Sequence, residues 1–321
     1  MPYHISVLVA VLLVTGCSRE TPGNQGKETM QPTPAASASP RFDAHRAFGY
    51  LKAQVAFGPR APNSEGHRRC LEYLVNTLRR SAESVRLQQF VEAGYDGEQL
   101  QLTNIIASFK PSLRQRILLC AHWDTRPRAE RDDDPEKRQK PILGANDGAS
   151  GVAVLLEIAA QLKQFPPAIG VDIVLFDGED YGKEGDLPRY LLGSQYFARS
   201  KPADYVPRFG ILLDMVGDAT LEIPQEKNSL RFAPDVVDMV WKTAQQLNVH
   251  QFVPEVGEEI YDDHIPLNRA GIKTIDLIDF NYPDETNRYW HTHQDTPEHC
   301  SAESLGAVGK VLSGIIGNLR P

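Results

Sequence analysis

Hydrophobic residues recur along this chain with two different spacings. In five segments they repeat every three or four residues, which predicts amphipathic helices at 41–60, 65–81, 148–165, 235–247 and 301–319. Six further segments are apolar runs or alternate with polar residues, which predicts strands at 84–92, 102–110, 116–121, 171–177, 208–218 and 272–279. Apolar strands that alternate with helices are typical of a parallel sheet buried on both faces. We therefore predict an α/β fold: a single domain with a mostly parallel central sheet and helices on both faces.

The N-terminal segment breaks this pattern. Residues 5–14 form an apolar run that is too short to span a bilayer, and Thr15-Gly16-Cys17 follows it. Such a run, ending in small residues and a cysteine, resembles a bacterial lipoprotein signal peptide, with cleavage before Cys17 and a lipid on its thiol. The leader departs from that pattern because it contains no Lys or Arg. An ordinary signal peptide with a chance cysteine is the alternative.

This resemblance predicts a lipoprotein-type signal peptide at 1–16 and a lipidated Cys17 that begins a tether at 17–40. The tether is expected to be disordered because 18–40 is rich in Pro, Ser, Thr and Gly and has few large apolar side chains to bury. Residues 41–321 would then form the globular domain. The protein would be exported and lipid-anchored on the periplasmic side of a bacterial membrane, with no other membrane contact.

Composition narrows the class of protein further. The chain has 321 residues, of which 41% are hydrophobic, so it can bury a large core. Its formal net charge is -8 and no basic stripe is visible, so we expect no nucleic-acid partner. The globular domain contains Cys70, Cys120 and Cys300. Three cysteines cannot all pair with one another, and the sequence leaves open whether one disulfide forms.

Polar and acidic residues gather where the predicted strands end, and sites in such sheets lie beyond the carboxyl ends of the strands. His122 and Asp124, Asp147, the acids of 177–180, Asp214, and the segment Trp290-His291-Thr292-His293 come from five separate loops. Asp177, Glu179 and Asp180 are crowded together directly after an apolar strand. Like charges in such a position need a positive partner, which could be an Arg, a helix end or a metal ion.

Each of these residues also has a plainer interpretation when taken alone. Asp147 could be the N-cap of the helix that follows it, Asp214 a loop acid, and His291 a structural or exposed histidine. Residues 132–134, three aspartates, are interpreted as a solvated surface run. Taken together, the carboxylates and imidazoles favour a metal, because they are common ligands of Zn²⁺. A cation would neutralise one of the crowded acids and leave another free to act as a base.

The ordered motifs of the chain resemble those of the zinc-aminopeptidase superfamily. They are "HWD" (122–124), "NDGASG" (146–151), "GED" (178–180), "LLDMVGD" (212–218) and "WHTHQDT" (290–296). The resemblance implies a zinc-dependent catalytic domain over 41–321. One branch, the two-metal aminopeptidases, would place one zinc on His122, Asp147 and Asp214 and another on Asp147, Asp180 and His291. Glu179 would then activate water.

A second branch, the bacterial glutaminyl cyclases, is favoured by three stretches. These are "IYDDHIPLNRAGI" (260–272), "LLDMVGD" and "YWHTHQDT" (289–296). "DGEDYG" (177–182) is similar to the bacterial form of this family. The Trp that animal enzymes carry shortly after this motif is absent, and Tyr181 or Tyr190 would take its place. A non-enzymatic binding domain on the same fold is a third, weaker alternative.

Resemblance to the cyclases implies a role for each matched residue. Asp147, Asp180 and His291 would hold one Zn²⁺ per chain, against two in an aminopeptidase. Glu179 would transfer protons, and Asp214 and Asp262 would form a hydrogen-bonded acidic pair. Trp290 and Ile260 would contact the substrate. His122 would bind a second metal or donate a hydrogen bond to the zinc site. The substrates would be peptides or proteins with an N-terminal Gln, the products pyroglutamate and ammonia, and the enzyme a monomer.

Overall fold

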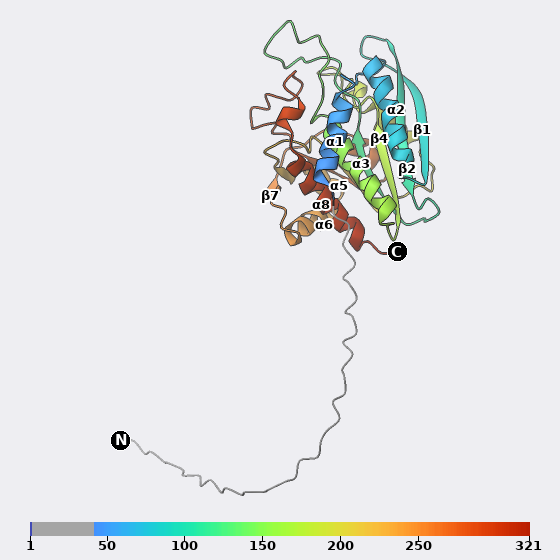
Figure 1. Cartoon of the computed structure of the whole chain (residues 1–321), viewed down its shortest axis with the longest axis vertical. Helices are drawn as coiled ribbons and strands as arrows, with labels where there is room; N and C mark the ends of the chain where they lie inside the picture. The colour runs from blue at the N-terminus through green and yellow to red at the C-terminus, as the bar shows by residue number, and fades with distance from the viewer. Residues whose placement is uncertain (2–41) are drawn as a thin grey trace, which may run out of the picture. The chain divides into compact units, whose positions relative to one another are not determined.

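The computed structural model describes residues 1 and 42–321 (Figure 1), so the predicted signal peptide, Cys17 and the tether lie outside the described residues. A six-stranded sheet forms the centre of the molecule, in the order β1-β2-β4-β3-β5-β8. Its strands are β1 Ser84–Ala93, β2 Gln99–Phe109, β3 Arg116–His122, β4 Gly170–Phe176, β5 Gly210–Asp214 and β8 Thr274–Ile278. Strands β4, β3, β5 and β8 run parallel, and the hairpin β1-β2 joins β4 in antiparallel fashion. The prediction of a mostly parallel sheet is confirmed.

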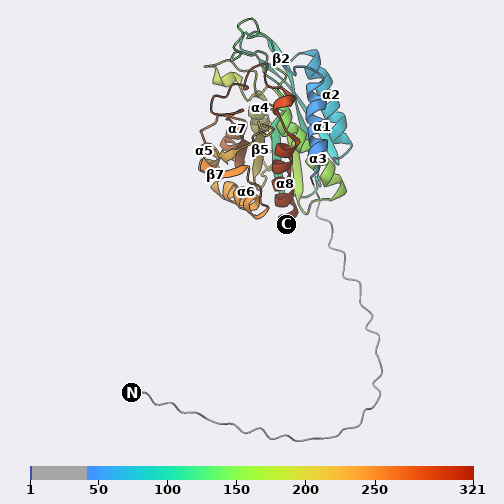
Figure 2. The same cartoon turned by 60° about the vertical axis from the view of Figure 1, so that its left-hand side comes forward.

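Helices cover both faces of this sheet, as predicted (Figure 2). The larger core contains side chains of α1 Ala44–Val55, α2 Glu65–Arg79, α3 Ala149–Gln164, α6 Pro234–Gln246 and α8 Ala302–Asn318. The other face packs on α4 Leu192–Ser200 and α7 His264–Arg269. Strand β3 serves both cores, because Ile117 and Leu119 point into the first and Leu118 and Cys120 into the second. This alternation explains why the buried strands are apolar throughout.

Short elements are the ones that the hydrophobic spacing does not predict. They are α4, α5 Lys227–Phe232, α7 and the two-stranded sheet of β6 Ile223–Gln225 and β7 Phe252–Val256. Such segments are too short to show a period, and tertiary contacts decide their conformation. The predicted strand 208–218 is also too long. It ends at Asp214 because Met215 adopts a φ of 47°, and Val216 N–H then donates to the Ser150 hydroxyl instead of a neighbouring strand.

Two further sequence questions are answered within the described part of the chain. Cys70, Cys120 and Cys300 are buried and free, so no disulfide joins them. No helix between residues 42 and 321 combines the length and hydrophobicity needed to cross a membrane.

The start of α3 approaches β5 so closely that only glycine fits. A Cβ at Gly151 would lie 2.2 Å from the Leu213 carbonyl oxygen and 3.1 Å from the Ala121 side chain. Neither neighbour is the end of a flexible side chain. Helix α3 is therefore held against the end of β5, one residue before Asp214.

We expect Gly151→Ala to lower the free energy of unfolding by about 1–3 kcal/mol, because α3 must move away from β5. The measurement is urea denaturation of the purified domain. Gly49→Ala is the matched control, since Gly49 is exposed in α1 and a Cβ there meets no atom within 4 Å. That change should leave stability unchanged or raise it by about 0.5–1 kcal/mol. Equal stability of the two variants would show that the close approach does not exist.

Candidate metal centre

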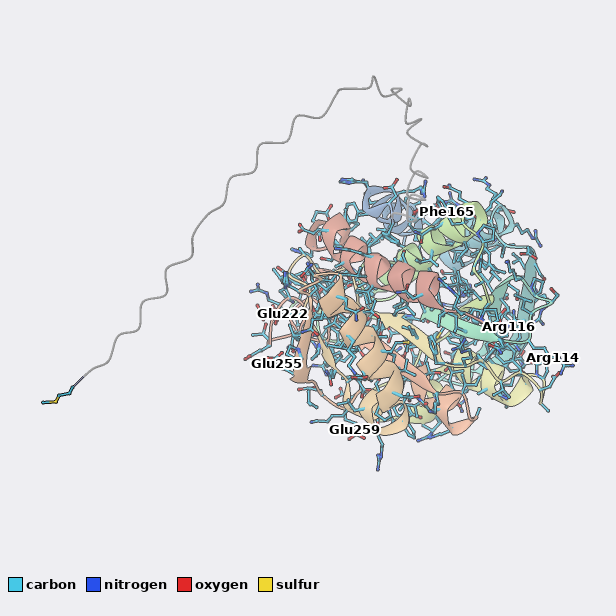
Figure 3. All side chains as sticks on the ribbon, turned by 90° about the horizontal axis from the view of Figure 1, so that it is seen from below. Arg114, Arg116, Phe165, Glu222, Glu255 and Glu259 are labelled. Atoms are coloured by element: carbon cyan, nitrogen blue, oxygen red, sulfur yellow. The ribbon has the colours of Figure 1, made fainter. Side chains whose placement is uncertain are left out.

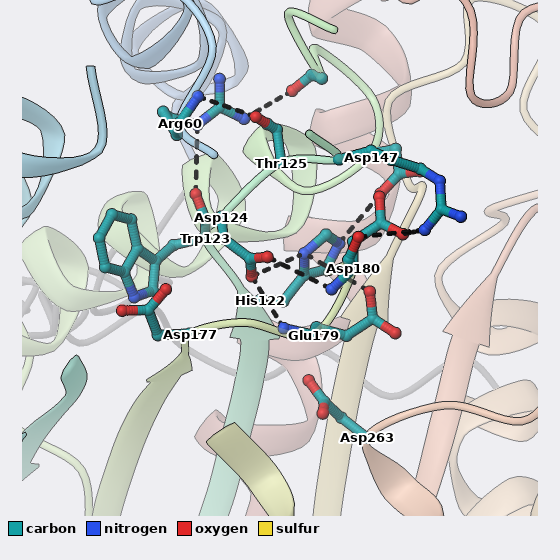
Figure 4. A network of polar contacts seen from close by, with 12 residues as sticks. Arg60, His122, Trp123, Asp124, Thr125, Asp147, Asp177, Glu179, Asp180 and Asp263 are labelled. Carbon is teal, nitrogen blue, oxygen red and sulfur yellow. Dashed lines mark hydrogen bonds and ion pairs between the residues drawn. The ribbon is translucent and has the colours of Figure 1, made fainter. Parts of the chain in front are cut away.

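Loops at the carboxyl ends of the parallel strands bring their acids and histidines to one buried site (Figure 4). Two groups of potential ligands share Asp147: one is His122, Asp147 and Asp214, and the other is Asp147, Asp180 and His291. Within each group the ligand atoms lie within 4.8 Å of one another. The sequence predicts that five loops meet at one edge of the sheet. In the structure the five candidate ligands from these loops lie together there.

Asp147 faces a different histidine with each of its oxygens. Its Oδ1 lies 3.2 Å from His122 Nε2, and its Oδ2 lies 3.6 Å from His291 Nε2. Asp214 Oδ1 is 3.2 Å from His122 Nε2, and Asp180 Oδ1 is 3.3 Å from His291 Nε2. The alternative that Asp147 caps a helix is wrong, because α3 begins at the N-cap Gly148 and has no side-chain cap.

Donor chemistry of this site fits a divalent cation. Buried carboxylates and imidazoles provide the oxygen and nitrogen ligands that zinc binds. Asp180 Oδ2 is buried, and no group in the described residues forms a hydrogen bond with it. Such an atom is costly to bury without a partner, and a cation would satisfy it.

Two aspartates fix the ligand loops by binding their main chain. Asp295 accepts hydrogen bonds from the N–H groups of Asn146 (2.8 Å) and Asp147 (3.1 Å). Asp124 accepts in the same way from the N–H groups of Glu179 (3.1 Å) and Asp180 (3.3 Å). Asp124 is one of the strand-end residues noted from the sequence but had no predicted role, and Asp295 was not singled out. Asp124 stands two positions after His122 in "HWD", and Asp295 stands four positions after His291 in "HTHQD".

Glycine at position 148 brings the main chain against His122. A Cβ there would lie 2.4–2.7 Å from atoms of the His122 ring. The Asn-Asp-Gly motif therefore combines a ligand with the residue that lets the neighbouring histidine approach it. His122 itself is 1% exposed, so its position is determined entirely by protein contacts.

The three crowded acids after β4 differ in their partners. Asp177 lies 2.8 Å from His67 Nε2 and accepts a hydrogen bond from Thr103 N–H at 2.6 Å. Asp180 accepts from Arg126 Nη1 at 2.7 Å and also faces the metal group. Glu179 belongs to neither metal group. Thus Asp177 is held by a histidine, Asp180 is held by an arginine and belongs to a candidate metal group, and Glu179 lies outside both candidate metal groups.

Environment makes Glu179 unusually basic for a carboxylate. Burial is the largest cause, and it raises the pKa of Glu179 well above its usual range. Asp180, Asp262 and Asp263 add to this increase, while His122 opposes it. Figure 4 shows Asp263 below Glu179. A raised pKa suits a group that must accept and release a proton during one turnover.

The predicted hydrogen-bonded pair of Asp214 and Asp262 needs correction. No hydrogen bond joins these two side chains among the described residues, because Asp214 turns toward His122 instead. A third carboxyl, Asp276, completes the group. Burial and then Asp214 raise the pKa of Asp262, and burial, Asp262 and Asp214 raise the pKa of Asp276. Within this trio of acids, burial and repulsion from neighbouring carboxylates therefore favour the protonated forms of Asp262 and Asp276. Asp262 is 3% exposed, so it is a buried carboxyl and not part of a solvated turn.

An aromatic pocket of about 210 Å³ adjoins His291. Trp290, Tyr190 and Tyr261 line it, and the Trp290 ring stacks on His291 with the ring centroids 3.8 Å apart. Of the two tyrosines considered as replacements for the missing Trp, Tyr190 is the one at the pocket. Tyr181 is buried and hydrogen-bonded to Glu98 instead.

Ile260 does not line this pocket but a neighbouring groove of about 740 Å³. The groove is acidic, and Glu222 and Glu255 lie at the same side of the molecule (Figure 3). Asp279 is buried in its wall and accepts hydrogen bonds from Glu222 N–H (2.8 Å) and Asn281 N–H (3.1 Å). These bonds hold the loop of Phe280, whose ring centroid lies 4.9 Å from that of Trp290.

Comparison with known proteins identifies relatives over most of the chain. Residues 104–316 match peptidase family M28. The structure of a glutaminyl cyclase from Bacteroides thetaiotaomicron is 44% identical, with a TM-score of 0.85 over 88% of this chain and 100% of its own. A Zn-dependent exopeptidase from Parabacteroides distasonis is 41% identical, with a TM-score of 0.85 over 88% and 100% of the two chains. A glutaminyl-peptide cyclotransferase-like protein of Bos taurus is 24% identical over 85% of this chain and 75% of its own.

We expect Asp279→Asn to flatten the pH dependence of stability. Burial raises the pKa of Asp279 to about 7, so the folded state holds a proton that the unfolded state releases at lower pH. Stability of the wild type should therefore fall as pH rises from about 4 to 7, by roughly 4 kcal/mol at most from this group. Urea denaturation at several pH values measures the slope. The exposed Asp204→Asn variant should keep the wild-type slope, and an unchanged slope in Asp279→Asn would contradict the assignment.

Proposed function

The chain belongs to peptidase family M28, and from this premise we propose that it is a zinc-dependent glutaminyl-peptide cyclotransferase. It would convert the N-terminal Gln of peptides or proteins to pyroglutamate and release ammonia. One observation carries the proposal: the buried group of Asp147, Asp180 and His291 adjoins a small aromatic pocket, while Glu179 remains outside the ligand group. Similarity to bacterial glutaminyl cyclases over nearly the whole globular domain supports it.

Asp147, Asp180 and His291 are the residues that would hold the metal, one Zn²⁺ per chain. Zinc, when bound there, supplies a Lewis acid that polarises the carbonyl of the substrate's γ-carboxamide. The protein's own contribution is to keep the ligands in place before binding. Asp295 and Asp124 provide this by anchoring the main chain of the two carboxylate ligands.

Glu179 would transfer the proton that the reaction moves. The α-amine nitrogen of the N-terminal Gln attacks the carbonyl carbon (Cδ) of its own γ-carboxamide, so a carbon–nitrogen bond forms and the bond from that carbon to the amide nitrogen breaks. Glu179 accepts a proton from the attacking amine and returns a proton to the departing nitrogen, which leaves as ammonia. Because the nucleophile is part of the substrate, folding the Gln side chain back supplies much of the rate by proximity. No water is consumed.

The acid trio and the aromatic pocket would orient the substrate. The carboxyl groups of Asp262 and Asp276 are buried beside Asp214, and their oxygens would accept hydrogen bonds from the α-amine or the leaving amide. Trp290 would cover the apolar part of the Gln side chain. His122, between Asp147 and Asp214, would connect the metal group to this trio.

A two-zinc aminopeptidase is the competing function, and one observation favours it. Asp147 turns one oxygen toward each histidine, which is the arrangement that a carboxylate bridging two metals requires. Zinc counting separates the two functions. About one tightly bound zinc with ammonia release selects the cyclase, whereas two zincs with cleavage of aminoacyl anilides select the peptidase.

We also propose that the mature protein is a lipoprotein, lipidated on Cys17 and held on the periplasmic side of a bacterial membrane by the tether 17–40. The support is the sequence alone, since these residues lie outside the described part of the chain. We propose that the enzyme acts as a monomer, since the described residues of a single chain are enough to form a complete candidate metal group.

Replacing the base tests the chemistry directly. Glu179→Gln should reduce ammonia release from a Gln-initiated dipeptide by about 10²–10⁴-fold, because the amide cannot accept the proton. The same sample should retain the zinc content of the wild type, since Glu179 is not a ligand.

Glu136→Gln, which alters an exposed acid, is the matched control and should keep full activity. Wild-type activity in zinc-loaded Glu179→Gln would exclude the proposed role of Glu179. A zinc-loaded wild type that releases no ammonia would exclude the cyclase function itself.

A second substitution tests the anchor. Cys17→Ser should move the full-length protein from the membrane fraction to the soluble fraction of expressing bacteria, because the acceptor thiol is lost. Ser18→Ala keeps the cysteine and should remain with the membrane. An unchanged distribution of Cys17→Ser would contradict lipidation at this position.

A further inference from the structure

The loop that follows β3 lies beside the candidate metal group of Asp147, Asp180 and His291. Its residues contact Asp180 and His291. From this geometry we propose that Arg126 and Glu130 are positioning residues, which set the affinity of the site for its metal and link the metal ligands to the substrate pocket. The identity of the metal as zinc rests on the proposed function. The positioning role rests on the contacts described below.

Arg126 uses its complete set of N–H donors on three side chains and one carbonyl. Nη1 donates to the Oδ1 (2.7 Å) and the main-chain oxygen (3.1 Å) of Asp180. Nε donates to Glu130 at 2.7 and 2.8 Å, and Nη2 donates to Glu130 and to the Tyr190 hydroxyl at 2.9 Å. Arg126 is 0% exposed, so this geometry is enforced by its surroundings. A planar guanidinium suits five donors in a fixed arrangement, and a lysine ammonium does not.

One consequence concerns Asp180. Arg126 occupies Oδ1 of this ligand, while Oδ2 is buried without a hydrogen-bond partner among the described residues. The guanidinium therefore fixes the rotation of the carboxylate and leaves one oxygen available to the metal. Without Arg126 the carboxylate could turn, and the ligand would have to be ordered each time a metal binds.

Glu130 extends the same arrangement to the second ligand. Its Oε1 lies 3.7 Å from Nδ1 of His291, the ring nitrogen that points away from Asp147 and Asp180. A histidine that binds a metal through one nitrogen is commonly oriented by a carboxylate near the other. Arg126 holds Glu130 in this position through two of its nitrogens.

A third acid of the same loop fastens it to the loop of His291. Asp132 accepts hydrogen bonds from the main-chain N–H of His293 (3.0 Å) and lies 2.9 Å from its Nδ1. Asp132 is 7% exposed, so the interpretation of 132–134 as a solvated run is wrong for this residue. These contacts join the loop after β3 to the loop that carries His291.

Tyr190 connects the arrangement to the pocket. Its hydroxyl accepts from Arg126, and its ring lines the pocket beside Trp290. The Arg126 guanidinium carbon lies 5.3 Å from the centre of the Tyr190 ring. One buried charge thus holds both a metal ligand and a pocket wall, so a change at Arg126 should alter metal binding and substrate binding together.

The test measures zinc affinity first, in the absence of substrate, by competition with a fluorescent chelator. Arg126→Lys should weaken zinc binding by about 10–100-fold, and Glu130→Gln by about 10-fold, because the ligands lose their orienting partners. Arg114→Lys, an exposed change before β3, is the matched control and should bind zinc like the wild type. If Arg126→Lys does not fold, the partly exposed Glu130→Gln variant carries the test.

Tyr190→Phe separates the two linked effects. It should raise KM for a Gln-initiated peptide several-fold while leaving zinc affinity within about twofold of the wild type, since the metal ligands keep Arg126. Wild-type zinc affinity in both Arg126→Lys and Glu130→Gln would overturn the inference. That outcome differs from failure of the proposed function, which would show as a zinc-loaded wild type without ammonia release.

Discussion

Electrostatic repulsion within a crowded, buried set of carboxylates is the constraint that organises this molecule. The acids lie where the parallel strands end, so the sheet itself brings them together. Water cannot screen them there, and each needs a proton, a hydrogen-bond donor or a positive charge nearby. Much of the structure around the site provides these partners.

The partners divide the acids by task. Main-chain N–H groups satisfy Asp124 and Asp295, which turns these side chains into anchors for the ligand loops. His67 partners Asp177, and Arg126 partners Asp180. Glu179 receives no comparable partner, and its proton affinity rises as a result. Three acids of one short segment therefore differ in their partners and in their proton affinity because their surroundings differ.

The sequence predicts the fold and the residues that gather at the candidate metal site, but few of the residues that hold them in place. The long helices and central strands have enough residues to show a period, and Asp147, Asp180 and His291 stand in ordered motifs at strand ends. No pattern in the sequence distinguishes Arg126 and Glu130, because charged residues in a loop after a strand are usually exposed to solvent. Only the folded structure shows that Arg126 is buried. Asp276 lies within a strand, where only the packing of β8 against the site gives it a role. What escaped prediction depends on contacts between distant segments.

The way in which the ligand loops are anchored has an evolutionary consequence. Asp124 and Asp295 accept hydrogen bonds from main-chain N–H groups, so these bonds do not depend on which side chains the loops carry. A substitution at position 180, for example of aspartate by glutamate, would leave the main-chain bond to Asp124 intact, while it changes the reach of the side chain and its contact with Arg126. A single mutation can therefore change a metal-binding side chain while the main-chain conformation of its loop is kept.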